Sequence, residues 1–312
     1  MDTVAVVMRE PGAVALSRLG LPEPDEGELT VRVDWSGIST GTERLLWDGT
    51  MPAFPGMGYP LVPGYETVGR VIQAAPGLES RLGEFVFVSG AHCYGEIRSL
   101  FGGAASHIVC NASKAHTIPE RLGLDGTLMA LAATAHHALC VGADAPELVV
   151  GHGVLGRLLA RVTIAAGYPA PVVWEVNETR QAGAAGYEVL HPDEDPSSDY
   201  RQICDVSGDP GILDSLVERL APGGEVTLAG FYSQPLSFTF PPAFMREARF
   251  VVAAEWQPED LSEVIALCAS NRLQLGQLIS HSVPADEAHS AYTTAFGDPE
   301  CLKMILDWRD LS

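Results

Sequence analysis

The most constraining feature of this chain is a glycine-rich turn between two apolar runs, within residues 147–177. The first run, residues 148–150, predicts a short buried strand. The turn Gly151-His-Gly-Val-Leu-Gly156 follows at once, and residues 157–166 then carry apolar side chains at helical spacing. The second run, residues 172–176, predicts the next strand. This order of strand, glycine turn, helix and strand is typical of a dinucleotide-binding unit.

Each glycine of the turn has a physical task. Gly151 allows a sharp turn out of the strand, and Gly153 has no Cβ, so a pyrophosphate can approach the backbone. Gly156 lets the helix pack closely on the sheet. The helix start, at Val154 and Leu155, offers free N–H groups to the anion.

Glu175 stands at the end of the second predicted strand, where a carboxylate can accept hydrogen bonds from the adenosine ribose. Its charge would repel a 2′-phosphate, so the sequence favours NAD over NADP. Asn177 lies at the same strand end and is a further candidate for cofactor contact. Arg180 is nearby and could bind a 2′-phosphate, which leaves NADP open as an alternative.

Composition excludes several classes of protein. With 312 residues the chain is long enough for two domains. Its formal net charge of −21 argues against nucleic acid and anionic lipid as partners. We find no apolar run long enough to span a bilayer and no signal-peptide pattern, so we expect a cytoplasmic protein. The six cysteines are scattered without a C-x-x-C pair, which suits a reducing compartment.

The pattern of the first 120 residues predicts mostly β-strands joined by irregular connections. In the run 29–35, Leu29, Val31, Val33 and Trp35 alternate onto one face. Strands are predicted at 4–8, 29–35, 67–72, 84–88 and 106–109, a short helix ends at Trp47, and 51–64 is too rich in Pro and Gly for regular structure.

From Leu122 onward, helical and strand-like runs alternate, which predicts a parallel sheet with crossover helices. Besides the elements of the glycine turn, strands are predicted at 203–206, 225–229 and 250–254, and helices at 128–141, 212–220 and 261–268. The last stretch reads as a strand, a helix over 285–296 and a strand over 303–308, and we expect it to return to the first domain.

Four segments together resemble the medium-chain dehydrogenase/reductase superfamily over nearly the whole chain. Pro60-Leu-Val-Pro-Gly-Tyr-Glu66 resembles the family segment P-x-x-x-G-H-E, and Ser36-Gly-Ile-Ser39 resembles its G-[IV]-C turn. Residues 220–230 resemble the strand that ends beside the nicotinamide, and Thr134 falls at the position of a nicotinamide-contacting threonine. The resemblance implies that Thr134, Val206, Ala229 and Gly230 contact the cofactor.

The resemblance implies an α/β protein of two domains. A GroES-like, β-rich catalytic domain would comprise residues 1–124 and 276–312. A Rossmann domain with a doubly wound parallel sheet, residues 125–275, would bind NAD.

The chain departs from the zinc-dependent members of this superfamily at the metal position. Ser39 replaces the first cysteine, Tyr65 replaces the histidine, and only Glu66 survives. Serine and tyrosine are poor zinc ligands, so we predict no metal. The alcohol proton must then be held by Ser39, Thr40, Tyr65 or Glu66, with Tyr65 first. Two alternatives stay open: Tyr65 only fills the vacated cavity, and Glu66 pairs with an arginine.

At a finer level the segments 36–49, 56–66 and 149–158 resemble a zinc-free branch of bacteriochlorophyll biosynthesis. That resemblance implies NAD-dependent oxidation of the 3-(1-hydroxyethyl) group of a (bacterio)chlorophyllide, a tetrapyrrole substrate, to 3-acetyl. It also makes a homodimer an expectation. A flat macrocycle needs an apolar slot. Trp47, Met51, Phe54, Met57 and Tyr59 could form the slot or simply cover the β core.

Two other functions remain compatible with the residues. One is a zinc-free NAD(P)H quinone or enoyl reductase of the same superfamily, which needs no group to hold an alkoxide. The other is a dinucleotide-binding protein without catalysis, since an intact glycine turn alone does not require chemistry.

Overall fold

The computed structural model describes residues 1–53, 56–232 and 234–311, and it divides into two compact units. The first unit comprises Met1–Ala130 and Leu275–Ser312, and the second comprises Leu131–Gln274. The sequence-based boundary at residue 124 falls inside the 3₁₀ segment η3 (Glu120–Leu128), which packs against strands of the first unit.

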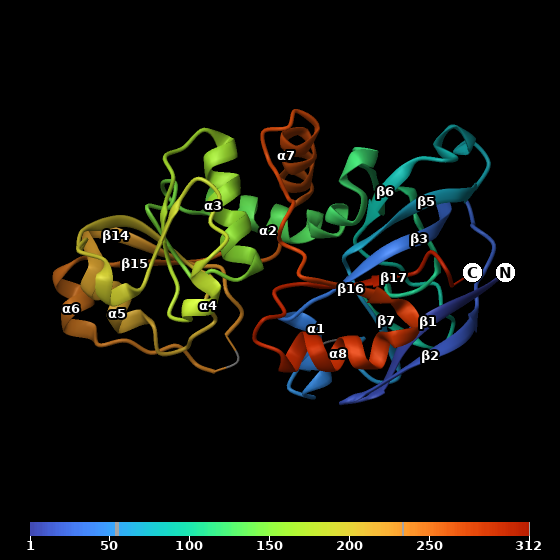
Figure 1. Ribbon diagram of the computed structural model, residues 1–312, viewed down its shortest axis with the longest axis horizontal. Helices are drawn as coiled ribbons and strands as arrows, with labels where there is room; N and C mark the ends of the chain where they lie inside the picture. Colours follow the sequence, from blue (N-terminus) through green and yellow to red (C-terminus); the bar gives the residue numbers. More distant parts are fainter. Residues whose placement is uncertain (54–55, 233, 312) are drawn as a thin grey trace. The chain divides into compact units, whose positions relative to one another are not determined.

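The first unit is built from two β-sheets and two helices (Figure 1). One sheet has the strand order β2-β1-β4-β7, and the other runs β16-β17-β3-β5-β6-β9 with β8 paired to β3. The strands are β1 (Asp2–Glu10), β2 (Ala13–Gly20), β3 (Glu28–Ile38), β4 (Leu61–Pro63), β5 (Thr67–Ala74), β6 (Phe85–Val88), β7 (Arg98–Leu100), β8 (His107–Asn111), β9 (Ala115–Thr117), β16 (His281–Pro284) and β17 (Met304–Asp307), and the helices are α1 (Thr42–Trp47) and α8 (Ala288–Gly297).

The C-terminal tail joins the first unit, as the sequence predicted. Strand β17 pairs antiparallel with β3, with Met304 opposite Ile38 and Asp307 opposite Trp35. Met304 and Leu306 of β17 are buried in the same core as the apolar residues of β3. Residues at the start of β17 are therefore held against the end of β3.

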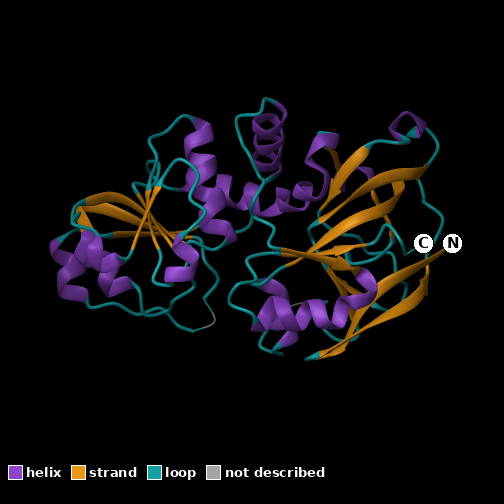
Figure 2. Cartoon of the chain, viewed as in Figure 1, coloured by secondary structure: helices purple, strands orange, loops and turns teal. Residues whose placement is uncertain are grey.

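The second unit is a six-stranded parallel sheet with helices on both faces (Figures 1 and 2). Its strand order is β12-β11-β10-β13-β14-β15, so the order reverses between β10 and β13. The strands are β10 (Leu148–Val150), β11 (Val172–Trp174), β12 (Glu188–Leu190), β13 (Tyr200–Asp205), β14 (Leu220–Leu228) and β15 (Arg249–Val252), and the helices are α2 (Met129–Val141), α3 (Val154–Ala166), α4 (Glu178–Gln181), α5 (Leu213–Arg219), α6 (Phe240–Met245) and α7 (Pro258–Ala269). In such a doubly wound sheet, ligands bind where the strand order reverses.

Several local expectations were wrong. Strands β2, β4, β7, β9 and β12 were not predicted, because four of them are short and β2 has an irregular burial pattern. The alternation of β3 fails at Trp35, since the register with β5 shifts between Val33 and Trp35. Trp35 is therefore only half-buried, beneath the Arg309 guanidinium.

Among the described residues, no helix combines the length and the apolar character needed to cross a membrane.

Candidate active site

The hydroxyls of Ser39 and Tyr65 meet at one end of the larger sheet of the first unit. Strands β3 and β5 pair antiparallel with Ser36 opposite Thr67, so the residue after β3 and the residue just before β5 come together. Ser39 Oγ lies 2.7 Å from the Tyr65 hydroxyl, and Ser39 Oγ also accepts a hydrogen bond from Thr42 N at 3.2 Å. Two side chains that stand at former metal positions thus form one hydrogen-bonded pair.

Thr40 stays outside this pair. It is half-buried and makes no side-chain hydrogen bond to any residue that the structure describes. The structure thus brings Ser39 and Tyr65 together without Thr40.

The phenol of Tyr65 keeps its proton at neutral pH. Burial, and then the negative charge of Glu66, raise the pKa of Tyr65 well above its ordinary value. The ring packs edge-on against Phe101, with 5.2 Å between the ring centroids. The oriented hydroxyl is therefore available as a hydrogen-bond donor, and not as a phenolate base.

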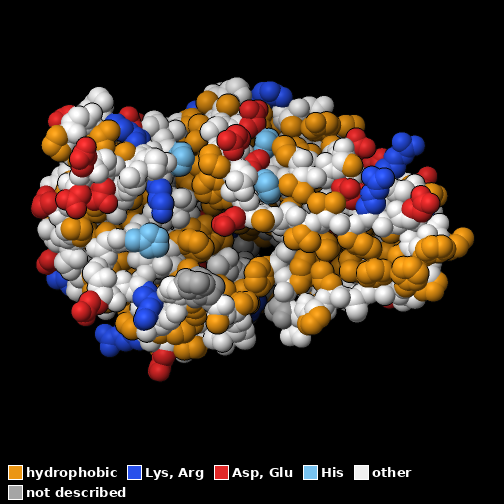
Figure 3. Space-filling view, turned by 180° about the vertical axis from the view of Figure 1, so that it is seen from behind, with side chains coloured by type: hydrophobic (Ala, Val, Ile, Leu, Met, Phe, Trp, Pro, Cys, Tyr) orange, Lys and Arg blue, Asp and Glu red, His pale blue; other side chains and the backbone are white. Residues whose placement is uncertain are grey.

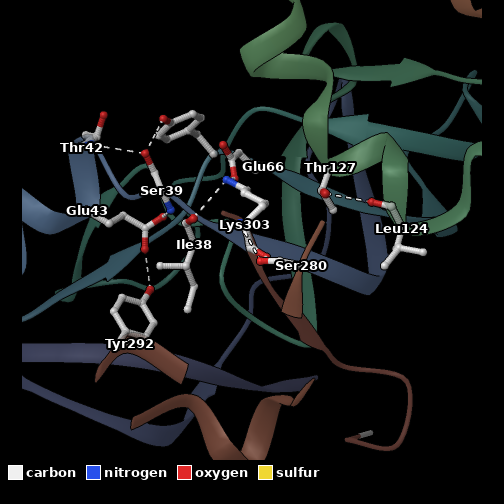
Figure 4. Close-up of polar contacts among 11 residues, drawn as sticks. Ile38, Ser39, Thr42, Glu43, Glu66, Leu124, Thr127, Ser280, Tyr292 and Lys303 are labelled. Atoms are coloured by element: carbon white, nitrogen blue, oxygen red, sulfur yellow. Dashed lines mark hydrogen bonds and ion pairs between the residues drawn. The ribbon is translucent and has the colours of Figure 1, made fainter. Parts of the chain in front are cut away.

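Glu66 forms a buried ion pair with Lys303, so the expected arginine partner was wrong. The exposed fractions are 0% for Glu66 and 2% for Lys303. Lys303 Nζ contacts Glu66 Oε2 and donates to Ile38 O at 3.0 Å (Figure 4). Gly37 leaves room for this pair, because a Cβ there would lie 2.2 Å from Glu66 Oε2. The cation neutralises a carboxylate that would otherwise be costly to bury.

A second buried carboxyl group, Glu43 on α1, lies beneath Ser39. Its Oε1 accepts a hydrogen bond from Ser39 N at 3.2 Å, and its Oε2 accepts one from the Tyr292 hydroxyl at 2.5 Å. Burial raises the pKa of Glu43 to about 7, and the charge of Glu66 contributes in the same direction. Glu43 thus titrates near neutral pH, which the sequence alone did not indicate.

The residues at the former metal position do not fit a catalytic zinc. A hydroxyl and a protonated phenol are poor ligands for this ion. Ser39 and Tyr65 already satisfy each other, and the nearby carboxylate of Glu66 is bound to the Lys303 cation. A dication would have to displace that cation, so no step of the chemistry is assigned to a metal here.

The aromatic residues before Gly64 cover the β core. Trp47 stacks on Tyr292 with 6.0 Å between ring centroids, and the Tyr59 hydroxyl donates to Leu46 O at 2.5 Å. Met51 and Met57 also pack on that core, while Phe54 lies outside the described residues. Of the two interpretations offered from sequence, these contacts support the covering of the core.

The glycine turn of the second unit has the geometry that the sequence predicted. Gly151 has a φ of +101°, a conformation that side chains with a Cβ rarely adopt. A Cβ on Gly153 would meet nothing within 4 Å, so its backbone is open to a ligand. A Cβ on Gly156 would lie 1.8 Å from Gly151 O, so only glycine allows α3 to start this close to β10. Helix α3 begins at Val154, and Leu155 follows in its first turn.

Glu175 holds the turn through backbone hydrogen bonds. Its Oε2 accepts from His152 N at 3.1 Å, and its Oε1 accepts from Asn177 N at 2.8 Å. A carboxylate has about four lone-pair sites, so it can still accept from a ligand hydroxyl. The side chain of Asn177 instead caps α4, where it accepts from Thr179 N at 3.0 Å.

His152 and Arg157 tie the turn to α4 and to the segment after it, which the sequence did not reveal. His152 Nδ1 donates to Arg180 O at 2.7 Å, and its Nε2 lies 2.9 Å from the Tyr187 hydroxyl. Burial lowers the pKa of His152 to about 4, so the ring is neutral. Arg157 donates to the carbonyl oxygens of His152, Arg180 and Ala182 at 2.8–3.0 Å. The sequence feature that could have indicated this arrangement is the histidine between two glycines, His152.

The remaining predicted cofactor residues lie in the same unit. Val206 follows β13, and Ala229 and Gly230 follow β14, so all three stand at the edge of the sheet that carries Gly151. Ala229 N and Gly230 N donate to Asp205 O at 2.9 and 3.0 Å. Thr134 is half-buried on α2.

Comparisons with known proteins show the family of the chain. Residues 25–120 match the alcohol dehydrogenase GroES-like domain. The chain is 56% identical over 312 residues to 2-desacetyl-2-hydroxyethyl bacteriochlorophyllide A dehydrogenase of Rhodobacter capsulatus, covering 99% of both chains. Two solved structures have the same fold. A short chain alcohol dehydrogenase from E. coli complexed with NADH has a TM-score of 0.83 at 21% identity, covering 98% of this chain and 99% of that one. A putative zinc-binding dehydrogenase from Sinorhizobium meliloti bound to NADP has a TM-score of 0.82 at 19% identity, with the same coverage.

These findings identify the class of enzyme. The chain is a dehydrogenase, an oxidoreductase that acts on a hydroxyl group. The chain belongs to the medium-chain dehydrogenase/reductase superfamily and, within it, to the family of the bacteriochlorophyllide dehydrogenases.

Proposed function

We propose that this enzyme oxidises the 3-(1-hydroxyethyl) group of a (bacterio)chlorophyllide to 3-acetyl, with NAD as the acceptor and without a catalytic metal. The substrate follows from the name of the Rhodobacter capsulatus relative, which is 56% identical over the whole chain. The observation that carries the metal-free mechanism is the Ser39–Tyr65 hydroxyl pair, where a zinc ligand set would otherwise stand.

Bound NAD supplies the hydride acceptor. In the second unit, the backbone N–H groups of the turn Gly151–Gly156 are suited to its pyrophosphate, and Glu175 to its adenosine ribose. The negative charge of Glu175 disfavours a 2′-phosphate, which supports NAD over NADP. Neutral His152, fixed by Arg180 O and Tyr187, adds no charge beside the anion.

A chain of donors can hold the alcohol oxygen in place of a metal. Thr42 N donates to Ser39 Oγ, so the Ser39 proton is free to point to the Tyr65 oxygen. The Tyr65 proton is then directed outward, to the substrate oxygen on which negative charge develops. Each bond in such a chain polarises the next, and donors placed before the reaction stabilise the oxyanion. The alcohol proton leaves to water.

The test is turnover of a 3-(1-hydroxyethyl) chlorophyllide with NAD, followed by visible absorption. Tyr65→Phe should lower kcat by roughly 10²–10⁴ and leave NAD affinity unchanged, since only the proton-bearing group is lost. Tyr59→Phe is the matched control, because that hydroxyl is used by Leu46 O. Unchanged turnover in Tyr65→Phe would remove the hydroxyl pair from the mechanism. Loss of turnover in a chelator, in a Cys140→Ser variant as well as in the wild type, would contradict the metal-free proposal, because Cys140 belongs to a separate cluster of possible metal ligands.

A homodimer through the free edge of the second sheet is also part of the proposal. Strand β15 is one of the two edge strands, and a shallow groove of about 610 Å³ beside it is lined by aromatic residues of the segment 238–250. Phe240, Phe244 and Met245 are exposed there by 64–76%. Figure 3 shows apolar side chains gathered over this part of the unit, while acidic and basic side chains are interspersed elsewhere on the same face. An apolar edge of this kind is suited to a second copy of the chain.

A further inference from the structure

Three potential metal ligands come together in the second unit, away from the glycine turn. His136 and Cys140 lie one helical turn apart on α2, so both project from the same side of the helix. Asp260 is in the first turn of α7. The ligand atoms of these three side chains all lie within 4.8 Å of one another.

The separations are close to those of a tetrahedral site. With metal–ligand bonds of about 2.0–2.3 Å, two nitrogen or oxygen ligands stand about 3.3 Å apart, and a nitrogen and a sulfur about 3.6 Å. His136 Nδ1 lies 3.7 Å from Cys140 Sγ, which already fits. His136 Nδ1 and Asp260 Oδ1 are 2.8 Å apart and would have to separate by about 0.5 Å.

The carboxylate is held in position by groups behind it. Asp260 Oδ2 accepts hydrogen bonds from Gln257 N at 2.8 Å and lies 2.9 Å from His137 Nδ1. Those bonds fix Oδ2 and leave Oδ1 directed to His136. Ligating carboxylates are commonly supported in this way by hydrogen bonds from outside the ligand set.

The site is also accessible from solvent. Cys140 is exposed, and it is the only exposed one of the six cysteines, all of which are described. The side chains of His136 and Asp260 are 14% and 7% exposed, so an ion would be partly enclosed by protein. The two helices supply three ligands, and water can complete a fourth position.

We propose that His136, Cys140 and Asp260 bind a divalent transition-metal ion of the zinc type, with His137 as a supporting residue. Imidazole, thiolate and carboxylate together favour such an ion over Mg²⁺ or Ca²⁺, which prefer oxygen ligands. Binding displaces the thiol proton of Cys140 to solvent, and neutral His136 takes the tautomer with its hydrogen on Nε2, so that Nδ1 can bind the ion. The ion would link α2 to α7. This site differs from the former catalytic metal position, and it departs from our sequence-based expectation of no metal.

Cobalt(II) is the probe, because a thiolate ligand gives bound Co²⁺ a strong near-ultraviolet charge-transfer band. We expect this band in the wild-type protein, saturating at about one ion per chain. Cys140→Ser should abolish the band, and His137→Gln should weaken affinity roughly 10–100-fold, as loss of a supporting hydrogen bond does. His281→Ala, which changes a half-buried histidine of the first unit, is the control and should behave as wild type.

A second readout uses the exposed thiol. Because the other five cysteines are buried, a thiol-reactive disulfide reagent reports on Cys140 in the native protein. Zn²⁺ should slow that reaction in the wild type, and His136→Ala should remove the protection. Cobalt binding without a charge-transfer band, or equal thiol reactivity with and without Zn²⁺, would overturn the proposal.

Discussion

Replacing Glu43 by glutamine should change how the free energy of unfolding depends on pH. Glu43 is 1% exposed, and burial raises its pKa from 4.5 to about 7 in the folded protein. Glutamine has the same shape but cannot ionise. Its oxygen can still accept from Ser39 N, and its amide group can donate to the Tyr292 oxygen.

The direction of this pH dependence follows from the proton that folded Glu43 keeps and unfolded Glu43 loses. Between pH 4.5 and about 7 the folded protein keeps the Glu43 proton, and the unfolded chain has lost it. The stability contributed by this proton is fully present below pH 4.5 and disappears as the pH rises through about 7. From about pH 5.5 to pH 8, the unfolding free energy of the wild type should fall by about 2 kcal/mol for this group alone. Glu43→Gln should lack that part of the fall.

The assay is denaturant-induced unfolding followed by tryptophan fluorescence at about pH 5.5 and pH 8, since Trp47 stacks on Tyr292. The measured quantity is the difference between the two pH values for each protein. Glu23→Gln is the matched control, because that side chain is 74% exposed, and it should follow the wild type. An identical pH dependence in Glu43→Gln and wild type would refute the assigned protonation of Glu43.

Three further predictions concern other parts of the molecule. Lys303→Met should destabilise the protein by roughly 3–5 kcal/mol in denaturant unfolding, because Glu66 stays buried without its cation, and adding Glu66→Gln should restore part of that loss. Glu175→Ala should abolish the preference for NAD over NADP in fluorescence titrations; equal affinity of the wild type for both would refute the role of Glu175. Light scattering should give a dimer for the wild type and a monomer for Phe244→Glu, whose side chain is 64% exposed at the sheet edge; a monomeric wild type would contradict the dimer.

The parts of the fold that could be predicted are those with local causes. The glycine turn could be predicted because two of its positions require glycine. Gly151 has a positive φ, and at Gly156 helix α3 starts too close to β10 to leave room for a side chain. Strand β12 has only three residues, too few for a clear alternation of buried and exposed side chains. Its place in the sheet is set by its pairing with β11. The sequence of one segment does not show which other segment it pairs with.

The features of the candidate site likewise divide into those that the sequence could predict and those that it could not. Ser39 and Tyr65 could be singled out because they stand at positions where the superfamily has metal ligands. Their hydrogen bond depends on the register of β3 and β5, which the structure supplies. Lys303 could have been suspected as a lysine beginning an apolar strand, but its partner Glu66 is 237 residues away. Asp260 likewise meets His136 only in the folded chain.

The buried charges beneath Ser39 bear on the proposed metal-free mechanism. Glu66 and Lys303 cancel, Tyr65 is neutral, and Glu43 is largely protonated below its pKa of about 7. These buried groups then carry no net charge, so in the proposed mechanism an alkoxide near Tyr65 would meet donors without facing a buried anion. Ionised Glu43 would oppose that alkoxide, since charges in a low-dielectric interior interact strongly. In the proposed mechanism, the proton on Glu43 would therefore take over part of the electrostatic task that zinc performs in zinc-dependent dehydrogenases.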